Sequence, residues 1–385
     1  MTEIGLNGLL LDSPYSGSAV YSRNLAPLLP QVAPDLEFRL YTRIEQLEAP
    51  GVAPQRLATP FRRFNRGAGP GARLDKLTWE TVALPVASAL RREALIHSLY
   101  FAAPPISASP LVVTVHDVIP LVLPGYHRTR QSAWYSRLMA WTVRRAAAII
   151  TVSQHSKGDI CRVLGVPEDR VTVTYEAVDE VYQPNRVEGE ADTLRSRYHL
   201  PQRYLLYTGG AEKRKNIALL IRAWEQACEA MRRHECNLVI VADFPPPDPL
   251  YPDIPRLIRE AGLGAEVYVV PRVAQADMPA LYRSALGFCF PSCYEGFGFT
   301  PLEAMACGVP VIASDATSLP EVVGDGGWLL PPDDAAAWAE AMIRLASSEG
   351  DRRQLAERAR QHSGRFSWRV TAEQTAQVYR NVLSR

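Results

Sequence analysis

The sequence lacks the features that define several common classes of protein. Its six cysteines form no Cys-x-x-Cys pair, and no Cys/His pair lies near Cys289 and Cys293 to complete a zinc site. No stretch reaches the roughly 18 apolar residues that a membrane span needs, and the N-terminus has neither the basic nor the apolar region of a signal peptide. We therefore expect reduced thiols, a cytoplasmic location and, at most, peripheral contact with the inner face of a membrane.

An excess of one sign of charge is also absent, because 42 Lys and Arg face 41 Asp and Glu. The net charge of +1 gives no reason to expect a nucleic-acid partner. Between Arg56 and Arg92, however, the acids are only Asp75 and Glu80. This region is either a solvated loop and helix face or a surface that meets anionic lipid or an acidic acceptor. Its basic residues are Arg56, Arg62, Arg63, Arg66, Arg73, Lys76, Arg91 and Arg92.

Length and patterning predict two domains of the α/β class. The 385 residues exceed the roughly 250–300 at which single cores stop growing. Two series of short apolar runs alternate with longer amphipathic segments, which is typical of β-α units, so we expect two doubly wound, Rossmann-like domains with ligand sites in the loops after the strands. The expected strands are 4–10, 38–41, 95–99, 111–115, 147–152 and 171–173, then 204–207, 238–241, 267–270, 287–290, 310–313 and 328–330.

Composition sets the expected boundaries between the parts of the chain. The first domain covers 1–180 and includes a long loop at 49–71, which is rich in Pro, Gly and Arg. Residues 181–200 are polar and show little periodicity, so they are expected to be a linker. The second domain covers 201–364, and a last helix covers 365–385.

The most informative segment follows the fourth strand of the second series. A loop with Gly296 and Gly298 precedes a helix start, where Thr300 suits the N-cap, Pro301 the first turn and Glu303 the third position. Glycines let the backbone approach a ligand, and the unpaired N–H groups of a helix start attract an anion. The segment therefore predicts a phosphate site. The alternative is a plain capping box, in which Glu303 serves only the helix.

A second candidate loop follows the first strand of the same series. It begins with Gly209 and Gly210 and continues through three basic residues, of which Arg214 and Lys215 precede Asn216. A flexible backbone with fixed cations suits a diphosphate. The alternative is a basic surface turn.

In the first half of the chain, His116 and Asp117 end a buried strand. A histidine there could donate to a sugar hydroxyl or share a proton during a reaction. The alternative is a structural turn with a satisfied histidine. Ser153 suits the N-cap of a following helix, and we interpret it as structural.

The spacing Glu295-x7-Glu303 resembles the signature of the retaining glycosyltransferases of family 4, which have two facing Rossmann-like domains known as the GT-B fold. The resemblance implies that Glu303 holds the ribose hydroxyls of the donor and that Glu295 contacts the transferred sugar near the reacting carbon. It also implies a donor-binding backbone beside the sugar and diphosphate, made by Gly296, Phe297, Gly298, Phe299 and Thr300.

The other candidate segments are similar to elements of the same family. The loop from Gly209 resembles its Gly-x-x-x-x-Arg-Lys-Asn element, in which Arg214 and Lys215 would neutralise the nucleotide diphosphate. Many relatives have an arginine where this sequence has Gly210. The His116-Asp117 element looks like that of members that often use mannose donors. On the acceptor side, the loop with Gly17 and Ser18 matches the family's glycine-rich first loop only at Gly17. The resemblance also implies that the last helix, 365–385, crosses back to pack on the N-terminal domain.

The resemblance implies a retaining hexosyltransferase that uses a nucleotide sugar, with Glu295, His116 and Asp117 as catalytic candidates. No Asp-x-Asp occurs, so we expect cations and backbone amides, and neither a metal nor a cofactor, to stabilise the leaving diphosphate. GDP-mannose is the favoured donor over UDP-linked sugars, and the expected acceptor is a glycan or lipid-linked oligosaccharide of polysaccharide synthesis. Alternatives on the same fold are a nucleotide-sugar epimerase, a phosphorylase, or an inactive nucleotide-sugar-binding protein.

Overall fold

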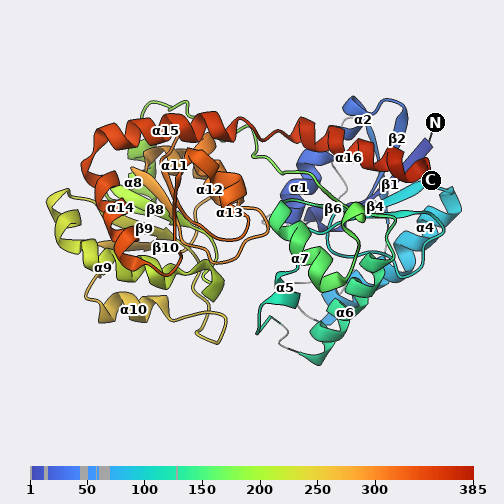
Figure 1. Ribbon diagram of the computed structural model, residues 1–385, viewed down its shortest axis with the longest axis horizontal. Helices are drawn as coiled ribbons and strands as arrows, with labels where there is room; N and C mark the ends of the chain where they lie inside the picture. The colour runs from blue at the N-terminus through green and yellow to red at the C-terminus, as the bar shows by residue number, and fades with distance from the viewer. Residues whose placement is uncertain (1, 13–15, 44–50, 58, 60–69, 127–128) are drawn as a thin grey trace. The chain divides into compact units, whose positions relative to one another are not determined.

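The computed structural model describes residues 2–12, 16–43, 51–57, 59, 70–126 and 129–385. The chain divides into two compact units (Figure 1). Unit 1 combines Met1–Glu176 with Ser367–Arg385, and unit 2 is the continuous stretch Ala177–Phe366. Each unit is built on one parallel sheet, as the alternation of strand and helix patterns predicts.

The sheet of unit 1 has the strand order β3-β2-β1-β4-β5-β6-β7, and all its neighbouring strands are parallel. Every residue of β4, β5 and β6 is buried, as expected for parallel strands covered on both faces. The chain order reverses between β1 and β4, which is where open α/β sheets bind ligands. The strands are β1 Thr2–Asn7, β2 Leu36–Thr42, β3 Val52–Arg56, β4 Leu95–Ser98, β5 Leu111–Thr114, β6 Ala148–Thr151 and β7 Val171–Val173.

Strand β3 differs from the sequence prediction, which placed a loop at 49–71. Val52–Arg56 pairs with β2 at the edge of the sheet. In the sequence, Pro54 argues against a strand. A proline is nevertheless tolerated on an edge strand, because its missing N–H would not have been needed for a hydrogen bond within the sheet. Residues 49, 50, 58 and 60–69 of the expected loop lie outside the described residues.

The last helix of the chain, α16, belongs to unit 1 and packs against α1 and α2. The hydroxyl of Thr371 donates to the carbonyl of Tyr175 over 2.5 Å, and Tyr379 Oη lies 2.6 Å from Nδ1 of the buried His97. The helices of unit 1 are η1 Leu9–Asp12, α1 Gly17–Leu25, α2 Leu29–Val32, α3 Pro70–Thr78, the π-helix η3 Trp79–Ala83, α4 Leu84–Arg91, α5 Ile119–Val122, α6 Arg130–Arg144, α7 Gln154–Leu164, η4 Glu168–Arg170 and α16 Trp368–Leu383.

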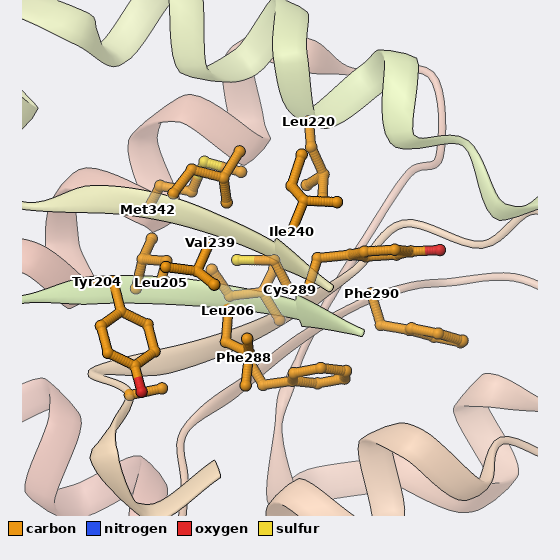
Figure 2. Close-up of a cluster of buried hydrophobic side chains, with 14 of the residues drawn as sticks. Tyr204, Leu205, Leu206, Leu220, Val239, Ile240, Phe288, Cys289, Phe290 and Met342 are labelled. Carbon is orange, nitrogen blue, oxygen red and sulfur yellow. The ribbon is translucent and has the colours of Figure 1, made fainter. Parts of the chain in front are cut away.

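The sheet of unit 2 has the order β10-β9-β8-β11-β12-β13, again parallel throughout. Figure 2 shows side chains of β8, β9 and β11 packed with Leu220 of α9 and Met342 of α14 in its core. The order reverses between β8 and β11, so the loops after these two strands are neighbours. The strands are β8 Tyr204–Thr208, β9 Asn237–Val241, β10 Val267–Val270, β11 Gly287–Phe290, β12 Val311–Ser314 and β13 Trp328–Leu330.

The segment 181–200, expected to be a linker, instead belongs to unit 2 and contains α8. Tyr182, Leu194 and Leu200 are buried in the unit 2 core, too few apolar residues to give a visible period in a polar stretch. Glu190 accepts two bonds from Arg283, over 2.9 and 2.7 Å. The helices of unit 2 are α8 Glu190–Tyr198, η5 Lys213–Lys215, α9 Ile217–Arg233, α10 Ile254–Glu260, η6 Gln275–Asp277, α11 Met278–Ser284, α12 Phe299–Ala306, α13 Leu319–Val323, η7 Gly324–Gly326, α14 Ala335–Ser347 and α15 Glu349–Ser363.

None of the helices in the described part of the chain combines the length and the apolar character that crossing a bilayer requires.

Candidate active site

The loop after β8 is shaped by two adjacent glycines with different roles. Gly209 has a φ of 150°, and a Cβ placed there would lie 3.1 Å from the hydroxyl oxygen of Tyr207, so only glycine fits without strain. Tyr207 supports the loop from below by donating to the carbonyl of Gly210 over 2.7 Å. A Cβ on Gly210, in contrast, would meet nothing within 4 Å.

Asn216 fixes the end of this loop. Its backbone is left-handed, with a φ of 56°, a conformation that asparagine tolerates better than most residues. Its side-chain amide donates to the carbonyls of Pro291, over 3.2 Å, and Pro332, over 2.7 Å. One residue therefore ties the loop after β8 to the loops after β11 and β13.

The cations of the loop meet the first glutamate of the spaced pair. Lys215 Nζ lies 2.7 Å from Oε1 of Glu295, and Arg214 Nη1 lies 3.1 Å from Oε2. Arg214 also pairs with Glu212 over 2.6 Å. Burial alone would raise the pKa of Glu295, but Lys215 and Arg214 outweigh it and hold that pKa below its usual value. Glu295 is therefore an ionised carboxylate inside a cationic loop.

Two residues beyond the expected set fasten the loop after β11. Ser318 donates to the carbonyl of Phe297, over 2.5 Å, and is 3.1 Å from that of Glu295. Thr317 accepts the backbone N–H of Glu295 over 3.0 Å. The sequence did not indicate this role of Ser318, because a hydrogen bond between residues 21 positions apart leaves no local signal.

Helix α12 begins two residues earlier than expected, which overturns one assignment. Its N-cap is Gly298, with a φ of 131°, so Thr300 lies inside the first turn instead of capping the helix. A Cβ on Gly298 would lie 3.1 Å from Leu319, which explains the glycine. The start of α12 therefore has no side-chain cap, and a helix N-terminus of this kind favours an anion.

Glu303 does not form the capping box that was the alternative. Its Oε2 accepts the hydroxyl of Tyr282, on α11, over 2.8 Å, and Tyr282 Oη lies 3.0 Å from Oγ1 of Thr208 at the end of β8. Burial raises the pKa of Glu303 to about 7, although the hydrogen bond from Tyr282 to the carboxylate lowers it. The helix thus presents a carboxylate that is partly protonated near neutral pH.

A cavity of about 720 Å³ lies beside the loop after β8, at the carboxyl ends of β8, β9 and β10. It is large enough for a small-molecule ligand. The sequence indicated one wall of the cavity, at Gly209 and Gly210. It did not indicate the opposite wall, because the loop after β9 has no recognised motif. That second wall consists of Ala242, Asp243, Phe244, Pro245 and Tyr251, with Val269 and Pro271 from the end of β10.

In unit 1, His116 has a partner that the sequence did not indicate. Its Nδ1 lies 3.1 Å from Oε1 of the buried Glu176, and its Nε2 lies 3.3 Å from the carbonyl oxygen of Leu99. A carbonyl oxygen only accepts, so Nε2 carries a proton, and the carboxylate favours a second proton on Nδ1. Burial lowers the pKa of His116, but the bond and charge of Glu176 outweigh burial and raise it. His116 is therefore held toward its cationic form.

The remaining unit 1 candidates have local roles. Asp117 Oδ1 accepts the N–H of Ile119 over 2.9 Å and opens α5, as the structural-turn alternative requires. Gly17 and Ser18 form the first turn of α1, which Ser16 caps by accepting from Ala19 over 3.2 Å. Ser153 caps α7, as expected. Of the basic region, Arg62, Arg63 and Arg66 lie outside the described residues.

Unit 2 thus gathers Arg214, Lys215 and Glu295 around the loops at the reversal of its sheet, with Glu303 on the adjoining helix α12. Unit 1 brings His116 to Glu176. The fold built on these two sheets is the GT-B fold of glycosyltransferases. Sucrose-phosphate synthase from Thermosynechococcus elongatus matches with a TM-score of 0.77, at 23% identity over 100% of both chains. WaaG, a glycosyltransferase involved in lipopolysaccharide biosynthesis, matches with a TM-score of 0.70, at 16% identity over 98% of this chain and 99% of its own.

Family comparisons agree with the fold. Residues 16–181 match the model described as Glycosyltransferase Family 4, and residues 193–362 match that described as Glycosyl transferases group 1. The O-antigen chain mannosyltransferase B of Escherichia coli is 34% identical over 271 residues, which are 70% of this chain and 70% of that protein. The chain therefore belongs to glycosyltransferase family 4, as its motifs predict.

Proposed function

We propose that this glycosyltransferase moves a hexose from a nucleotide sugar to a glycan or lipid-linked acceptor, with retention at the anomeric carbon and without a metal. The observation that carries the proposal is the loop after β8, in which Arg214 and Lys215 are held at Glu295, near the start of α12, which has no side-chain cap. Fixed cations and helix N–H groups are what a departing diphosphate needs.

Each residue then has a distinct task. Arg214 and Lys215 neutralise the diphosphate, and Gly298 lets the backbone N–H groups of α12 face it. Glu303 accepts the ribose hydroxyls, and Glu295 contacts the transferred sugar. On the acceptor side His116, which Glu176 keeps protonated, donates to a sugar hydroxyl once its Nε2–H leaves the carbonyl oxygen of Leu99. The departing phosphate accepts the acceptor's proton as the new bond forms on the same face.

GDP-mannose is the proposed donor. The support is the His116-Asp117 element and the similarity to a mannosyltransferase at 34% identity. A polysaccharide or lipid-linked acceptor is proposed from that relative's role on an O-antigen chain.

The first experiment measures the melting temperature with GDP, UDP, ADP and dTDP, and then with the matching nucleotide sugars. A ligand at 100 times its Kd stabilises a protein by about 2.7 kcal/mol, which is readily seen. A shift with guanine nucleotides alone supports the proposed donor. No shift with any nucleotide contradicts a donor site in unit 2, and turnover of donor without an acceptor indicates an epimerase instead.

Two variants test the tasks assigned to the carboxylates. Glu303→Ala is expected to weaken nucleotide binding, because it removes the ribose contact. Glu295→Ala is expected to lower turnover while the free nucleoside diphosphate still binds, because Arg214 and Lys215 keep their charge. Activity is expected to persist in EDTA, and loss of activity that manganese restores would overturn the metal-free mechanism.

A further inference from the structure

Tyr21, on α1, lies against the ring of His116. The two ring centroids are 5.0 Å apart and the ring planes meet at 89°, which is an edge-to-face arrangement. Tyr21 is fully buried, whereas the side chain of His116 keeps 16% of its surface exposed. The tyrosine therefore supports, from within the fold, a histidine that solvent can still reach.

This ring contact restricts a rotation that the polar partners of His116 leave open. Glu176 attracts Nδ1 over 3.1 Å, and the carbonyl oxygen of Leu99 lies 3.3 Å from Nε2, which is long for a hydrogen bond. The outer torsion of a histidine side chain is only broadly restricted by its own covalent geometry. Because the ring of Tyr21 stands at a right angle to the imidazole, it limits by steric contact how far the imidazole can turn.

Tyr21 is itself anchored at its hydroxyl group. Its Oη lies 3.2 Å from Oγ1 of Thr114, which is on β5 two residues before His116. The same Oγ1 lies 2.8 Å from Nε2 of His97, on β4. Nδ1 of His97 in turn lies 2.6 Å from Oη of Tyr379, on α16. A chain of hydrogen bonds, buried along its whole length, thus runs from α1 to α16.

The imidazole in the middle of this chain is held by two unlike partners. Burial lowers the pKa of His97 to about 3, so its ring is neutral and carries a single N–H. One ring nitrogen therefore donates and the other accepts, so Tyr379 and Thr114 take opposite roles. The ring of His97 cannot turn over without breaking both hydrogen bonds. The chain is consequently a rigid anchor for Tyr21.

Helix α16 also reaches Tyr21 directly. Trp368 packs on Tyr21 with 5.9 Å between the ring centroids and 64° between the ring planes, and Thr375 is buried beside the same phenol. The spacings from Trp368 to Thr375 to Tyr379 are seven and four residues, which places all three on one face of the helix. Apolar side chains would fill this space without the cost of burying hydroxyls and an imidazole, so packing alone does not explain the set.

We propose that Tyr21 is a positioning residue for His116 and that α16 holds Tyr21 in place. The inference rests on the proposed function, in which Nε2 of His116 donates to a sugar hydroxyl. Misplacing a reacting group by about 1 Å can lower a rate by about a hundredfold. Tyr21 limits the turning of the imidazole, so that Nε2–H needs only a small shift from the carbonyl oxygen of Leu99 to reach the hydroxyl.

The first test is NMR of the histidine ring nitrogens in the full chain, labelled at histidine and without ligand. The signals of His116 are assigned by their loss in His116→Gln. The wild type is expected to give one sharp set of ring N–H signals for His116. Tyr21→Leu, which removes the ring, is expected to broaden or remove them, because the imidazole then turns and exchanges its protons with water. Tyr21→Phe, which keeps the ring, is expected to retain them.

Leu164→Ala is the matched control for lost stability. Leu164 is buried in the core of unit 1, at the last residue of α7. That helix runs back from the end of β6 to the start of the parallel strand β7, so Leu164 lies at the opposite edge of the sheet from His116. The control should lose melting temperature, as Tyr21→Leu does, and keep the His116 signals. Loss of these signals in the control, or unchanged signals in Tyr21→Leu, would overturn the proposal.

Activity measurements separate this inference from the proposed function. With GDP-mannose as donor and a mannose disaccharide as acceptor, Tyr21→Leu is expected to lower kcat on the order of tenfold to a hundredfold, with little change in KM for the donor. Tyr21→Phe should recover most of that loss. In a His116→Gln background Tyr21→Leu should cause no further loss, because it acts through the histidine. Equal losses in both backgrounds would contradict the positioning role. No transfer by the wild type would contradict the proposed substrates, and the NMR result would still decide whether Tyr21 positions His116.

Discussion

At the residue scale, the protonation state of the Glu303 carboxylate depends on the side chains around it. The carboxylate is held by Tyr282 in a position where burial raises its pKa to about 7. Only the ionised form is a full acceptor for two hydroxyls of a ribose. In the proposed role of Glu303, its state near neutral pH therefore decides how well a nucleotide is held.

We predict that nucleotide affinity falls as the pH drops below about 7. The raised pKa means that the free enzyme gains a proton there and must lose it to bind, which weakens binding by up to about tenfold per pH unit. In Glu303→Gln the affinity is lower, and this part of the pH dependence is gone. Calorimetric titrations measure the affinity of both proteins from pH 5.5 to 8.5, roughly the range around that pKa. The ionisation of the nucleotide itself affects both proteins equally, so it cancels in the comparison. Parallel profiles for the two proteins would refute the role of Glu303.

A second prediction concerns Glu176, a positioning residue that acts through His116. Glu176→Gln removes the charge that raises the pKa of His116, so the ring loses its second proton at a lower pH. If the cationic form is needed, the alkaline limb of the kcat profile moves to lower pH, while KM for the donor changes little. A uniform loss of kcat with an unmoved profile would indicate that Glu176 only supports the fold.

At the scale of elements, the two glycines that begin the loop after β8 should respond in opposite ways. Gly209→Ala is expected to cost about 1–3 kcal/mol of stability, because its φ of 150° strains any side chain. Gly210→Arg meets open space, so the fold should be kept and nucleoside diphosphates should bind up to about fivefold tighter at low salt. Urea unfolding and calorimetry measure the two effects. Equal destabilisation by both changes would contradict the described geometry.

The elements also show how far the sequence can be used for prediction. Buried parallel strands such as β5 and β6 are near-continuous apolar runs, so their positions are predictable. Strand β3 contains a proline and α8 has few apolar residues, so neither has a period to detect. The loop after β8, with its basic residues, was predictable from its local motif. The pairing of Glu176 with His116 was not, because tertiary contacts 60 residues apart in the chain leave no local pattern.

At the scale of the whole molecule, the two units should differ in independence. Residues 177–366 form an uninterrupted unit with its own core, so this fragment is expected to unfold cooperatively and to be stabilised by nucleotide. Residues 1–176 lack α16 and would expose the surface that it covers, so they are expected not to fold.

The control is unit 1 with its two segments joined by a short Gly-Ser linker from Glu176 to Ser367. The bond between Tyr175 and Thr371 places the two ends close together, so this protein should fold. Circular dichroism and thermal unfolding compare the three proteins. A cooperative transition in residues 1–176 alone would contradict the need for α16.

The interruption of unit 1 also affects the order in which the protein matures on the ribosome. Domains usually fold as they emerge, the N-terminal one first. Here the second unit is complete once residue 366 has left the exit tunnel, while the first still waits for Ser367–Arg385. While residues 177–366 are being made, the nascent chain therefore carries a first unit that still lacks α16. A premature stop codon in the last helix would consequently damage the part of the protein that was made first.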